Sequence, residues 1–505
     1  MKCPKCHADN LDRPRRRRFK DREQAKSTMN RRDFLVGTTA AMLAAAELNA
    51  AWPAQKQDSP RPSEKGEPTN LPHNSHYQYL REEIDQIPAI SAHDHLCPEK
   101  QAVAMKTDLF DVLFSGLVWV DLVSAGYRLQ PGDTFFGLEP EGDKRPRDGD
   151  LAWSRVKPRL DNVQDTAVFQ VRMRGLRELF DFQEELSDSN WRVLNERVMA
   201  AQQPGRYFDV LRKRQNLEAT LLDRPNTWAG TDAADRFYSV NVMKVLPWTN
   251  LAQFALKTSG LGVGPLETLD QTVEALEVYV ARLMKEGVIA LKMLHAYTRT
   301  IEFDDVPKEV AEKDFPKPDD SGPIPKTVQD YMAGQICRLA AEYDVPVAFH
   351  TGYQLGNDND IRNSRAQLLC SLIHRHPNTR FDLFHTGYPY ADETMLLAKY
   401  FPNVTFNMSF GVHLSPTKMV ELLHVALELM PTNKILAYGC DEFILEGHVG
   451  ATAIWRDCIA RCLAERIEDG KLTRPRALRL MRKLVRDNAA EAYRYDRWRA
   501  QHPAD

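Results

Sequence analysis

The chain has 505 residues, of which 43% are hydrophobic, and this is the composition of a globular protein that can bury a large core. Its formal net charge of -3 provides no general electrostatic attraction to nucleic acid. The eight cysteines are scattered and indicate no disulfide framework. We therefore expect one large domain with appendages, no nucleic-acid partner, and a function that depends on a specific site.

Residues 1–28 form a basic leader with two motifs that allow more than one interpretation. C-P-K-C, at Cys3 and Cys6, is half of a zinc knuckle, but no second pair lies nearby to complete four ligands. The run Pro14–Arg18 could be a nucleic-acid patch. Because it precedes an export signal, we favour a leader that is untranslated or removed, with Met29 as an alternative start.

Residues 29–54 resemble a twin-arginine export signal. The motif N-R-R-D-F-L at Asn30–Leu35 precedes a small and apolar stretch, with A-x-A-like cleavage options near residues 50–54. The stretch is short and is interrupted by Glu47 and Asn49, so we expect a cleaved signal and no permanent membrane anchor. The resemblance implies transport of the folded protein by the twin-arginine translocase, to a periplasmic or extracellular location.

After a linker at residues 55–75 that is rich in Pro, Ser, Glu and Lys and is expected to be disordered, residues 76–505 alternate between helical and strand patterns. Thr268–Glu286 shows the unit most clearly: apolar residues at helical spacing, a T-x-x-Q capping box, and then a buried-strand run. Eight such runs occur: P-A-I-S-A-H-D-H, L-E-A-T-L-L-D, F-Y-S-V-N-V-M-K-V-L, V-I-A-L-K-M-L, V-P-V-A-F-H, F-D-L-F-H, N-V-T-F-N-M-S-F and K-I-L-A-Y-G-C-D. Eight is the number of parallel strands that closes a barrel, so the predicted fold is α/β, a TIM-type (β/α)8 barrel.

The first and second predicted strands are separated by a long segment at about residues 96–216. Its patterning is mostly helical, including Asp165–Leu179 and Asn190–Ala201, and it is too long for a loop. We expect a helical insertion that starts at the carboxyl end of the first strand and lies over the barrel mouth. The Pro- and charge-rich segment Asp304–Lys326, after the fourth strand, is expected to be a surface loop or lid.

Four metal-ligating side chains lie at the ends of predicted strands. Residues two apart on a strand point to the same face, so His93 and His95 project together. His350 ends the fifth predicted strand and Asp441 ends the eighth, which lies beside the first in a closed barrel. Each histidine alone is more often a core or surface residue, so the combination carries the prediction. We predict one divalent metal, with Zn as the first choice and Mn, Fe or Co as alternatives.

The expected chemistry follows from this ligand set. A divalent metal lowers the pKa of its water from about 15.7 toward about 7. Asp441 can contact the metal and also accept the water's proton. His385 ends the sixth predicted strand and is placed to polarise a substrate carbonyl or to act as a general acid. Asp94, between the two metal histidines, is expected to point away from the mouth and to support the site.

The phrases I-P-A-I-S-A-H-D-H-L, V-A-F-H-T-G, F-H-T-G-Y-P-Y and Y-G-C-D-E-F resemble the amidohydrolase superfamily and its amidohydrolase-related branch, with a more distant likeness to uronate isomerases. The resemblance runs from Tyr79 to about Tyr495. It implies the same four metal ligands and an active-site role for His385. Members of the branch include hydrolases of amides and lactones, metal-dependent decarboxylases and uronate isomerases, so the reaction does not follow from the resemblance.

Three further residues are candidate substrate-binding groups. Lys292 lies near the end of the fourth predicted strand, where binuclear members of the superfamily carry a carbamylated lysine that bridges two metals. We favour a single metal, and leave open whether Lys292 binds a substrate carboxylate or is a salt-bridged residue without a catalytic role. Tyr297 and Arg299 follow in H-A-Y-T-R. Arg299 could hold a carboxylate or phosphate through two hydrogen bonds, or it could be a solvated surface residue.

Our leading prediction is hydrolysis, in which activated water attacks the carbonyl-type carbon of an amide, ester or lactone. Lys292 and Arg299 favour a small acidic substrate. One alternative keeps the site but changes the reaction to decarboxylation or to isomerisation of a sugar acid. The other is an exported binding protein that retains the barrel. The oligomeric state stays open.

Overall fold

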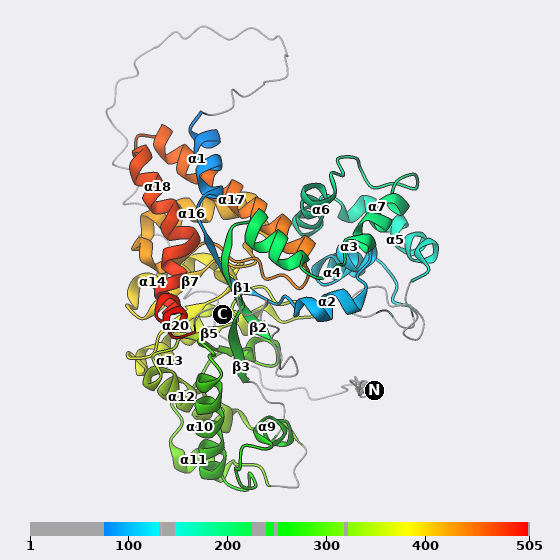
Figure 1. The fold of residues 1–505 in the computed structure, drawn as a ribbon. Coiled ribbons are helices and arrows are strands. Elements are labelled where there is room, and N and C mark those ends of the chain that lie inside the picture. Colours follow the sequence, from blue (N-terminus) through cyan, green and yellow to red (C-terminus); the bar gives the residue numbers. More distant parts are fainter. Residues whose placement is uncertain are drawn as a thin grey trace, which may run out of the picture. The chain divides into compact units, whose positions relative to one another are not determined.

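The computed structural model describes residues 75–130, 133, 147–224, 239–246, 251–317 and 322–502 (Figure 1). The predicted leader and export signal, C-P-K-C included, and nearly all of the predicted linker lie outside these ranges. Within the described ranges, no helix is long and apolar enough to cross a membrane.

Eight parallel strands form one sheet, and their order in space is their order in the sequence. The strands are β1 (Ala89–Asp94), β2 (Leu217–Arg224), β3 (Ser239–Leu246), β4 (Ala290–Met293), β5 (Val347–Phe349), β6 (Phe381–Leu383), β7 (Val404–Asn407) and β8 (Ile435–Leu436). Each lies inside one of the eight predicted runs, except that β2 extends one residue beyond its run, and this confirms the prediction of eight parallel strands. Every residue of β4 is buried, as expected for a parallel sheet that is covered on both faces.

The eighth predicted strand is regular for only two residues, but the chain continues along β1. Backbone hydrogen bonds join Ala92 N–H to Tyr438 O (3.0 Å), Asp441 N–H to His93 O (2.8 Å) and His95 N–H to Glu442 O (3.0 Å). A Cβ on Gly439 would collide with the side chain of Ser409, so the chain approaches the end of β7 too closely for a larger residue. The segment beyond β8 is therefore held against β1 by regular hydrogen bonding.

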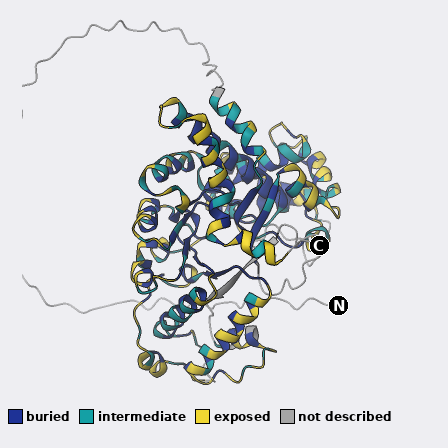
Figure 2. Ribbon diagram, turned by 60° about the vertical axis from the view of Figure 1, so that its left-hand side comes forward, coloured by how far each residue is buried: buried dark blue, intermediate teal, exposed yellow. Residues whose placement is uncertain are grey.

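The helices of the described residues surround this sheet (Figures 1 and 2), and Figure 2 shows that the buried residues gather on the strands and on the inner sides of the helices. They are α1 (Ser75–Asp85), α2 (Glu99–Met105), α3 (Leu109–Phe114), α4 (Leu117–Ser124), α5 (Gly149–Val163), α6 (Ala167–Phe180), α7 (Trp191–Ala200), the π-helical η2 (Phe208–Arg214), α9 (Leu251–Thr258), α10 (Leu269–Lys285), α11 (Lys308–Lys313), α12 (Lys326–Glu342), α13 (Cys370–Arg375), α14 (Ala391–Tyr400), α15 (Gly411–Leu414), α16 (Pro416–Leu429), α17 (Leu445–Glu468), α18 (Arg474–Arg482), α19 (Asn488–Ala492) and α20 (Tyr495–Gln501).

The predicted start of α10 is confirmed by its capping contacts. Thr268 Oγ1 accepts the backbone N–H of Gln271 at 3.2 Å, and Gln271 Oε1 accepts the backbone N–H of Thr268 at 3.0 Å. This capping box satisfies two donors that a helix otherwise leaves unpaired. After β4 the structure differs from the prediction in one respect, because α11 forms inside the segment that was expected to be a loop or lid.

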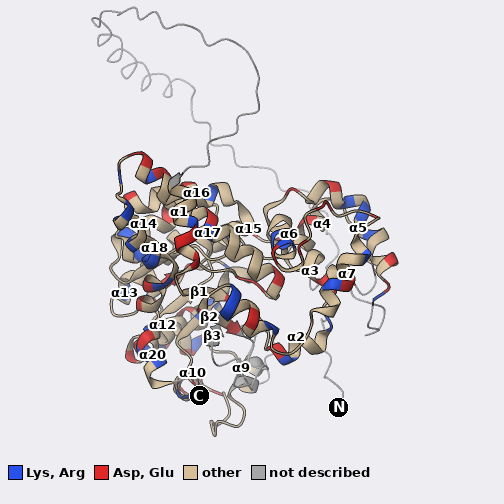
Figure 3. Ribbon diagram, turned by 45° about the horizontal axis from the view of Figure 1, so that its top comes forward, with Lys and Arg blue, Asp and Glu red and all other residues tan. Residues whose placement is uncertain are grey.

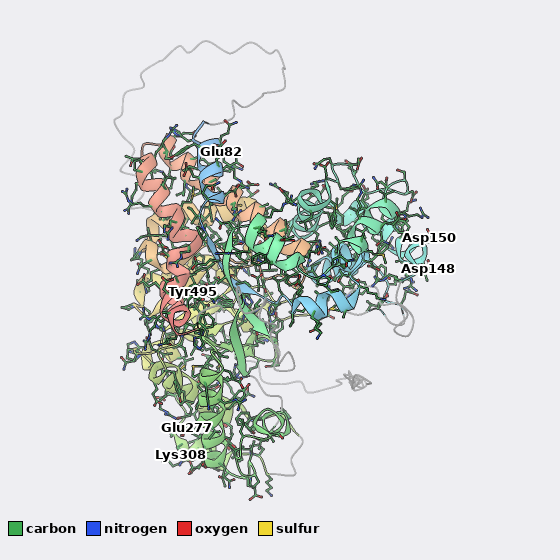
Figure 4. The ribbon with its side chains drawn as sticks, viewed as in Figure 1. Glu82, Asp148, Asp150, Glu277, Lys308 and Tyr495 are labelled. Atoms are coloured by element: carbon green, nitrogen blue, oxygen red, sulfur yellow. The ribbon has the colours of Figure 1, made fainter. Side chains whose placement is uncertain are left out.

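The helices α2–α7 and η2 lie between β1 and β2, and α6 and α7 begin and end within two residues of their predicted positions. Helices α3–α7 share a cluster of buried apolar side chains that is separate from the main core. Asp148, which caps α5, and Asp150 lie at the outer edge of this group (Figure 4). In Figure 3, Lys and Arg residues are interspersed with Asp and Glu residues over the drawn helices.

Helix α6 is fixed to α17 by contact between their backbones. A Cβ on Gly175 of α6 would collide with the carbonyl of Glu446, and a Cβ on Gly450 of α17 would collide with the carbonyl of Val171. The two helices lie side by side in Figure 1. Glycine is required at both positions because any side chain would push the helices apart. The helices between β1 and β2 are thereby anchored to α17, which lies far from them in the sequence.

We expect Gly450→Ala to lower the free energy of unfolding by about 1–3 kcal/mol, because the collision outweighs the higher helix propensity of alanine. Gly264→Ala is the matched control, since a Cβ there meets nothing within 4 Å. Urea denaturation of both variants would measure the difference. Equal midpoints for the two variants would show that the α6–α17 contact is not tight.

Candidate metal centre

Three of the predicted metal ligands converge on one oxygen atom. His93 on β1 and His95, one residue beyond β1, each place Nε2 3.1 Å from Oδ1 of Asp441. Asp441 adopts φ 56°, a left-handed backbone conformation that is uncommon outside glycine, as the chain turns away from β1. The side chains from the two ends of the sheet thus meet as the strand pattern predicted.

The hydrogen bond of His95 shows which nitrogen of its ring carries the proton. His95 Nδ1 lies 2.9 Å from the backbone oxygen of Asp223, which can only accept, so Nδ1 carries the proton. The lone pair of Nε2 is then directed at the Asp441 carboxylate. Two electron-rich atoms 3.1 Å apart repel each other unless a cation or a proton lies between them. A divalent metal fits this arrangement, and a backbone carbonyl behind a ligating imidazole is the usual second partner.

His350 has the same arrangement but lies slightly apart. Its Nε2 is 2.9 Å from the backbone oxygen of Tyr353, which leaves Nδ1 as the electron-pair donor. Among the described residues, two groups of potential ligand atoms at this site lie within 4.8 Å of one another: His93 with His385 and Asp441, and His93 with His95 and Asp223. His350 is in neither group, although its ring centroid is 4.5 Å from that of His385.

Burial favours the neutral forms of His93, His350 and His385. Burial, with the charge of Lys292 second, lowers the pKa of His93 to about 4 and that of His350 to about 3. Burial also lowers the pKa of His385 well below its usual value. Burial alone would raise the pKa of Asp441, but its interactions with His93 and His95 hold that pKa well below the usual value. Neutral imidazoles beside a carboxylate are the protonation states that bind a metal.

Lys292 lies beside the candidate metal ligands. Its Nζ is 3.3 Å from His93 Nε2, 3.8 Å from Asp223 Oδ2 and 3.9 Å from the centre of the Phe384 ring. Only 1% of the residue is exposed. The ammonium group is therefore engaged by the protein at the base of the site.

Of the other two candidates for substrate binding, one lines the cavity and the other does not. Tyr297 lines the cavity, and its hydroxyl accepts the backbone N–H of Leu355 at 3.2 Å. Arg299 does not line it. The Arg299 guanidinium pairs with the buried carboxylate of Asp330 and lies 4.8 Å from the Phe303 ring centre. Asp330 is almost fully buried and needs a cationic partner, which accounts for the position of Arg299 and does not support substrate binding by it.

These groups open into a cavity of about 540 Å³, a size suited to a small molecule. Its lining is His93, His95, Gly116, Leu117, Arg172, Asp223, Lys292, Leu294, Tyr297, His350, Tyr353, Leu355, Gly356, His385, Phe410, Asp441, Glu442 and Phe443. The polar groups of the metal centre occupy one part of the lining, and leucine and aromatic side chains supply much of the rest.

Several of these residues were not predicted. Asp223 lies at the end of the second predicted strand, so the strand-end rule that selected Asp441 could have found it. Arg172 lies on α6, where an arginine among helical residues gives no signal. Arg172 Nη2 is 2.9 Å from Glu442 Oε2, and Glu442 Oε1 is 2.8 Å from His413 Nε2. Asp94 has the predicted supporting role, since it accepts the backbone N–H of Glu442 at 3.1 Å.

Comparison with known proteins agrees with this geometry. Residues 318–495, about a third of the chain, match the family model for amidohydrolases (Amidohydro_2), and this segment contains His350, His385 and Asp441. Protein fluG of Emericella nidulans is 27% identical over 175 residues, which are 33% of this chain. The match covers only 20% of the length of that protein.

Solved structures extend the likeness to most of the chain. A protein of Lactobacillus casei, provisionally described as a metal-dependent hydrolase, is similar over 83% of this chain and 98% of its own (TM-score 0.59, 17% identity). Residues 318–495 thus resemble the amidohydrolase family, and a fold likeness to a protein described as a hydrolase extends over most of the chain. Glucuronate isomerase of Caulobacter crescentus is similar over 85% of this chain and 96% of its own (TM-score 0.69, 16% identity). A uronate isomerase of Thermotoga maritima matches over 83% and 97% (TM-score 0.64, 15% identity), and at such identities the likeness shows the fold alone.

If the converging lone pairs bind a metal, added metal must stabilise the folded enzyme. We expect zinc at about 100 times its dissociation constant to raise the free energy of unfolding of the metal-stripped enzyme by about 2.7 kcal/mol. At that same zinc concentration, His95→Gln should lose most of this gain. His424→Gln is the control, because His424 Nε2 contacts Glu465 away from the cavity. Denaturation with and without zinc measures the effect, and an equal gain in the His95 variant would refute the role of His95.

Proposed function

We propose that this enzyme is a metal-dependent hydrolase whose single divalent metal, Zn first among Zn, Mn, Fe and Co, is held by four side chains: His93, His95, His350 and Asp441. The observation that carries this proposal is the pair of imidazoles directed at one Asp441 oxygen, each 3.1 Å away. The carbonyls that fix the tautomers of His95 and His350 support both as ligands. His385 Nδ1 lies 3.6 Å from Asp441 Oδ2, farther than either 3.1 Å contact, and we assign that imidazole to the substrate.

We also infer that the strands close into a (β/α)8 barrel with a helical insertion after β1. The hydrogen bonds from β1 to residues 438–442 support closure, because they pair the first strand with the continuation of the last. The helices α2–α7 between β1 and β2 support the insertion. The candidate site then lies at the carboxyl ends of the strands, where enzymes with this fold keep their chemistry.

A divalent metal in this site would supply Lewis-acid activation of water and of the substrate carbonyl. Asp441 is ionised and is placed to accept the proton from the attacking water and to pass it to the leaving group. His385, with Nδ1 3.6 Å from Asp441 Oδ2, is neutral because it is buried. A neutral imidazole donates an N–H to a developing oxyanion, so we assign His385 to polarising the carbonyl and not to general acid catalysis by a charged imidazolium.

Replacing His385 should separate catalysis from metal binding. The residue has φ 65°, a conformation that asparagine tolerates better than most residues, so His385→Asn is the least disruptive variant. We expect ester or lactone hydrolysis to fall about 10²- to 10³-fold while the zinc content stays unchanged. Turnover and metal content are measured on the same preparation. Unchanged turnover, or zinc lost together with activity, would contradict the assignment.

The same assays decide the reaction. Hydrolysis gives acid and leaving group, whereas decarboxylation releases carbon dioxide and isomerisation gives a product of the same mass as the substrate. Carbon dioxide release or an isomeric product from a panel of carboxylic and sugar acids, without hydrolysis of any ester, amide or lactone, would replace hydrolysis with one of the two alternatives.

We further propose that residues 29–54 direct export through the twin-arginine translocase, after the metal has been bound in the cytoplasm. The motif N-R-R-D-F-L supports this proposal. Replacing both Arg31 and Arg32 by lysine should retain the enzyme in the cytoplasm of a bacterial host, and fractionation with an immunoblot measures this. Arg22→Lys, which lies before the motif, is the control. Export of the double variant at the normal level would contradict the proposal.

A further inference from the structure

The wall of the cavity contributed by α4 and α6 contains a second potential ligand site, which lies outside the proposed metal ligands. Arg172 of α6 lines the cavity, yet only 2% of the residue is exposed. Its Nη2 pairs with Glu442, but Nε and Nη1 have no hydrogen-bond partner within the described residues. A buried guanidinium with unsatisfied donors is costly unless an anion binds it.

A second group of donors lines the same cavity. Gly116 and Leu117 are the N-cap and first residue of α4, and both are lining residues. Gly116 has no side chain to cap the helix, and the helix has no side-chain cap hydrogen bond. The first backbone N–H groups of this eight-residue helix therefore carry partial positive charge without a capping side chain. Helices α4 and α6 are in contact, and the terminus of α4 and Arg172 line the same cavity.

Glu442 and the helix contact keep Arg172 in place. Glu442 Oε1 is engaged by His413 at 2.8 Å, so Glu442 is shared between two donors and satisfies Arg172 only in part. A Cβ on Gly447 of α17 would collide with both Glu442 and the Arg172 guanidinium, so glycine at that position leaves room for the pair. The glycine contact between α6 and α17 fixes the helix that carries Arg172.

The remaining lining restricts the rest of the ligand. Leu117, Leu294 and Leu355 line the cavity together with Phe410 and Phe443. The Phe443 ring stacks on His95 with centroids 4.7 Å apart, so an apolar face adjoins the metal centre. Tyr297 and Tyr353 also line the cavity. The five leucine and phenylalanine side chains offer no hydrogen bonds to a polyol, and they would bury an apolar ring or chain favourably.

We propose that Arg172 and the N-terminus of α4 bind the carboxylate of the substrate, and that the substrate is an amphipathic acid with an apolar body. This inference rests on the proposed function for the placement of the scissile carbonyl at the metal, but the anion site itself does not need the metal. It also moves the role of substrate cation from Lys292 and Arg299, which the protein itself engages, to Arg172.

The test is calorimetric binding of benzoate, an apolar-bodied carboxylate, to the metal-stripped and the zinc-loaded enzyme. We expect Arg172→Met to weaken benzoate binding about 10- to 100-fold in both forms and to leave binding of benzyl alcohol unchanged. Arg174→Met is the matched control, since Arg174 is on the same helix but pairs with Glu178 and Asp457. Glucuronate should bind more weakly than benzoate.

Glu442→Gln gives a second, opposite prediction. Removing the internal carboxylate frees Arg172, so benzoate should bind as tightly as in the unmodified enzyme or more tightly. Because Arg172→Met alone leaves Glu442 buried without its partner, Arg172→Met combined with Glu442→Gln keeps the charge balanced if the single variant does not fold. The double variant should bind benzoate about 10- to 100-fold more weakly than the unmodified protein, as expected for Arg172→Met alone.

Three results would overturn the proposal. They are benzoate affinity that is unchanged in the Arg172 variants, tighter binding of glucuronate than of benzoate, and tighter binding of phenyl phosphate than of benzoate, which would assign the site to a phosphate. If one of these results is found while zinc binding and hydrolysis persist, the anion site is refuted and the proposed metal site is not. Absence of zinc binding would refute the metal centre instead.

Discussion

The backbone hydrogen bond from Asp441 N–H to His93 O, 2.8 Å long, is the contact on which the candidate site depends. It joins the first strand to the segment beyond the last, and it sets the Asp441 carboxylate beside both imidazoles of the H-D-H motif. Asp94, whose side chain points away from these imidazoles, strengthens the same junction. It accepts hydrogen bonds from Ser91, Thr220 and the backbone of Glu442. Asp94, which lies between the candidate ligands His93 and His95 in the sequence, thus holds the backbone next to Asp441.

This junction also sets the electrostatics of the site. The His93 and His350 imidazoles are buried beside a lysine, and both burial and that positive charge favour their neutral forms. The carboxylate is buried too, but the histidines around it keep it ionised. A site that holds neutral nitrogen donors and one negative oxygen in advance binds a divalent cation without a large rearrangement of protons. Burial therefore helps to set the protonation states of the candidate ligands before a metal binds.

The helices between β1 and β2 contribute through a different constraint. Glycines on α6 and α17 let the two backbones meet, and that contact holds Arg172 against the cavity. The strand ends thus carry the candidate metal-binding groups, and helix α6 carries a cation that lines the same cavity. This division suits a fold in which the chemistry stays constant at the strand ends, while the substrate is selected by the segments that cover them.

The sequence by itself determined the features that follow from local periodicity. Alternation of helical and strand patterns predicted all eight strands, and the period of two along a strand placed His93 and His95 on one face. Strand ends also marked His350, His385, Lys292 and Asp441. These predictions hold because parallel strands in sequential order bring their carboxyl ends together whatever the loops do.

Only the tertiary structure decided which charged groups reach the cavity. Arg299 and Arg172 look alike in the sequence, yet Arg299 pairs with the buried Asp330 while Arg172 lines the cavity. The outcome depends on contacts between residues far apart in the chain, such as Arg172 with Glu442 and α6 with α17. A long charged side chain pairs with a buried charge of opposite sign within its reach. The local sequence pattern does not predict where that buried charge will lie.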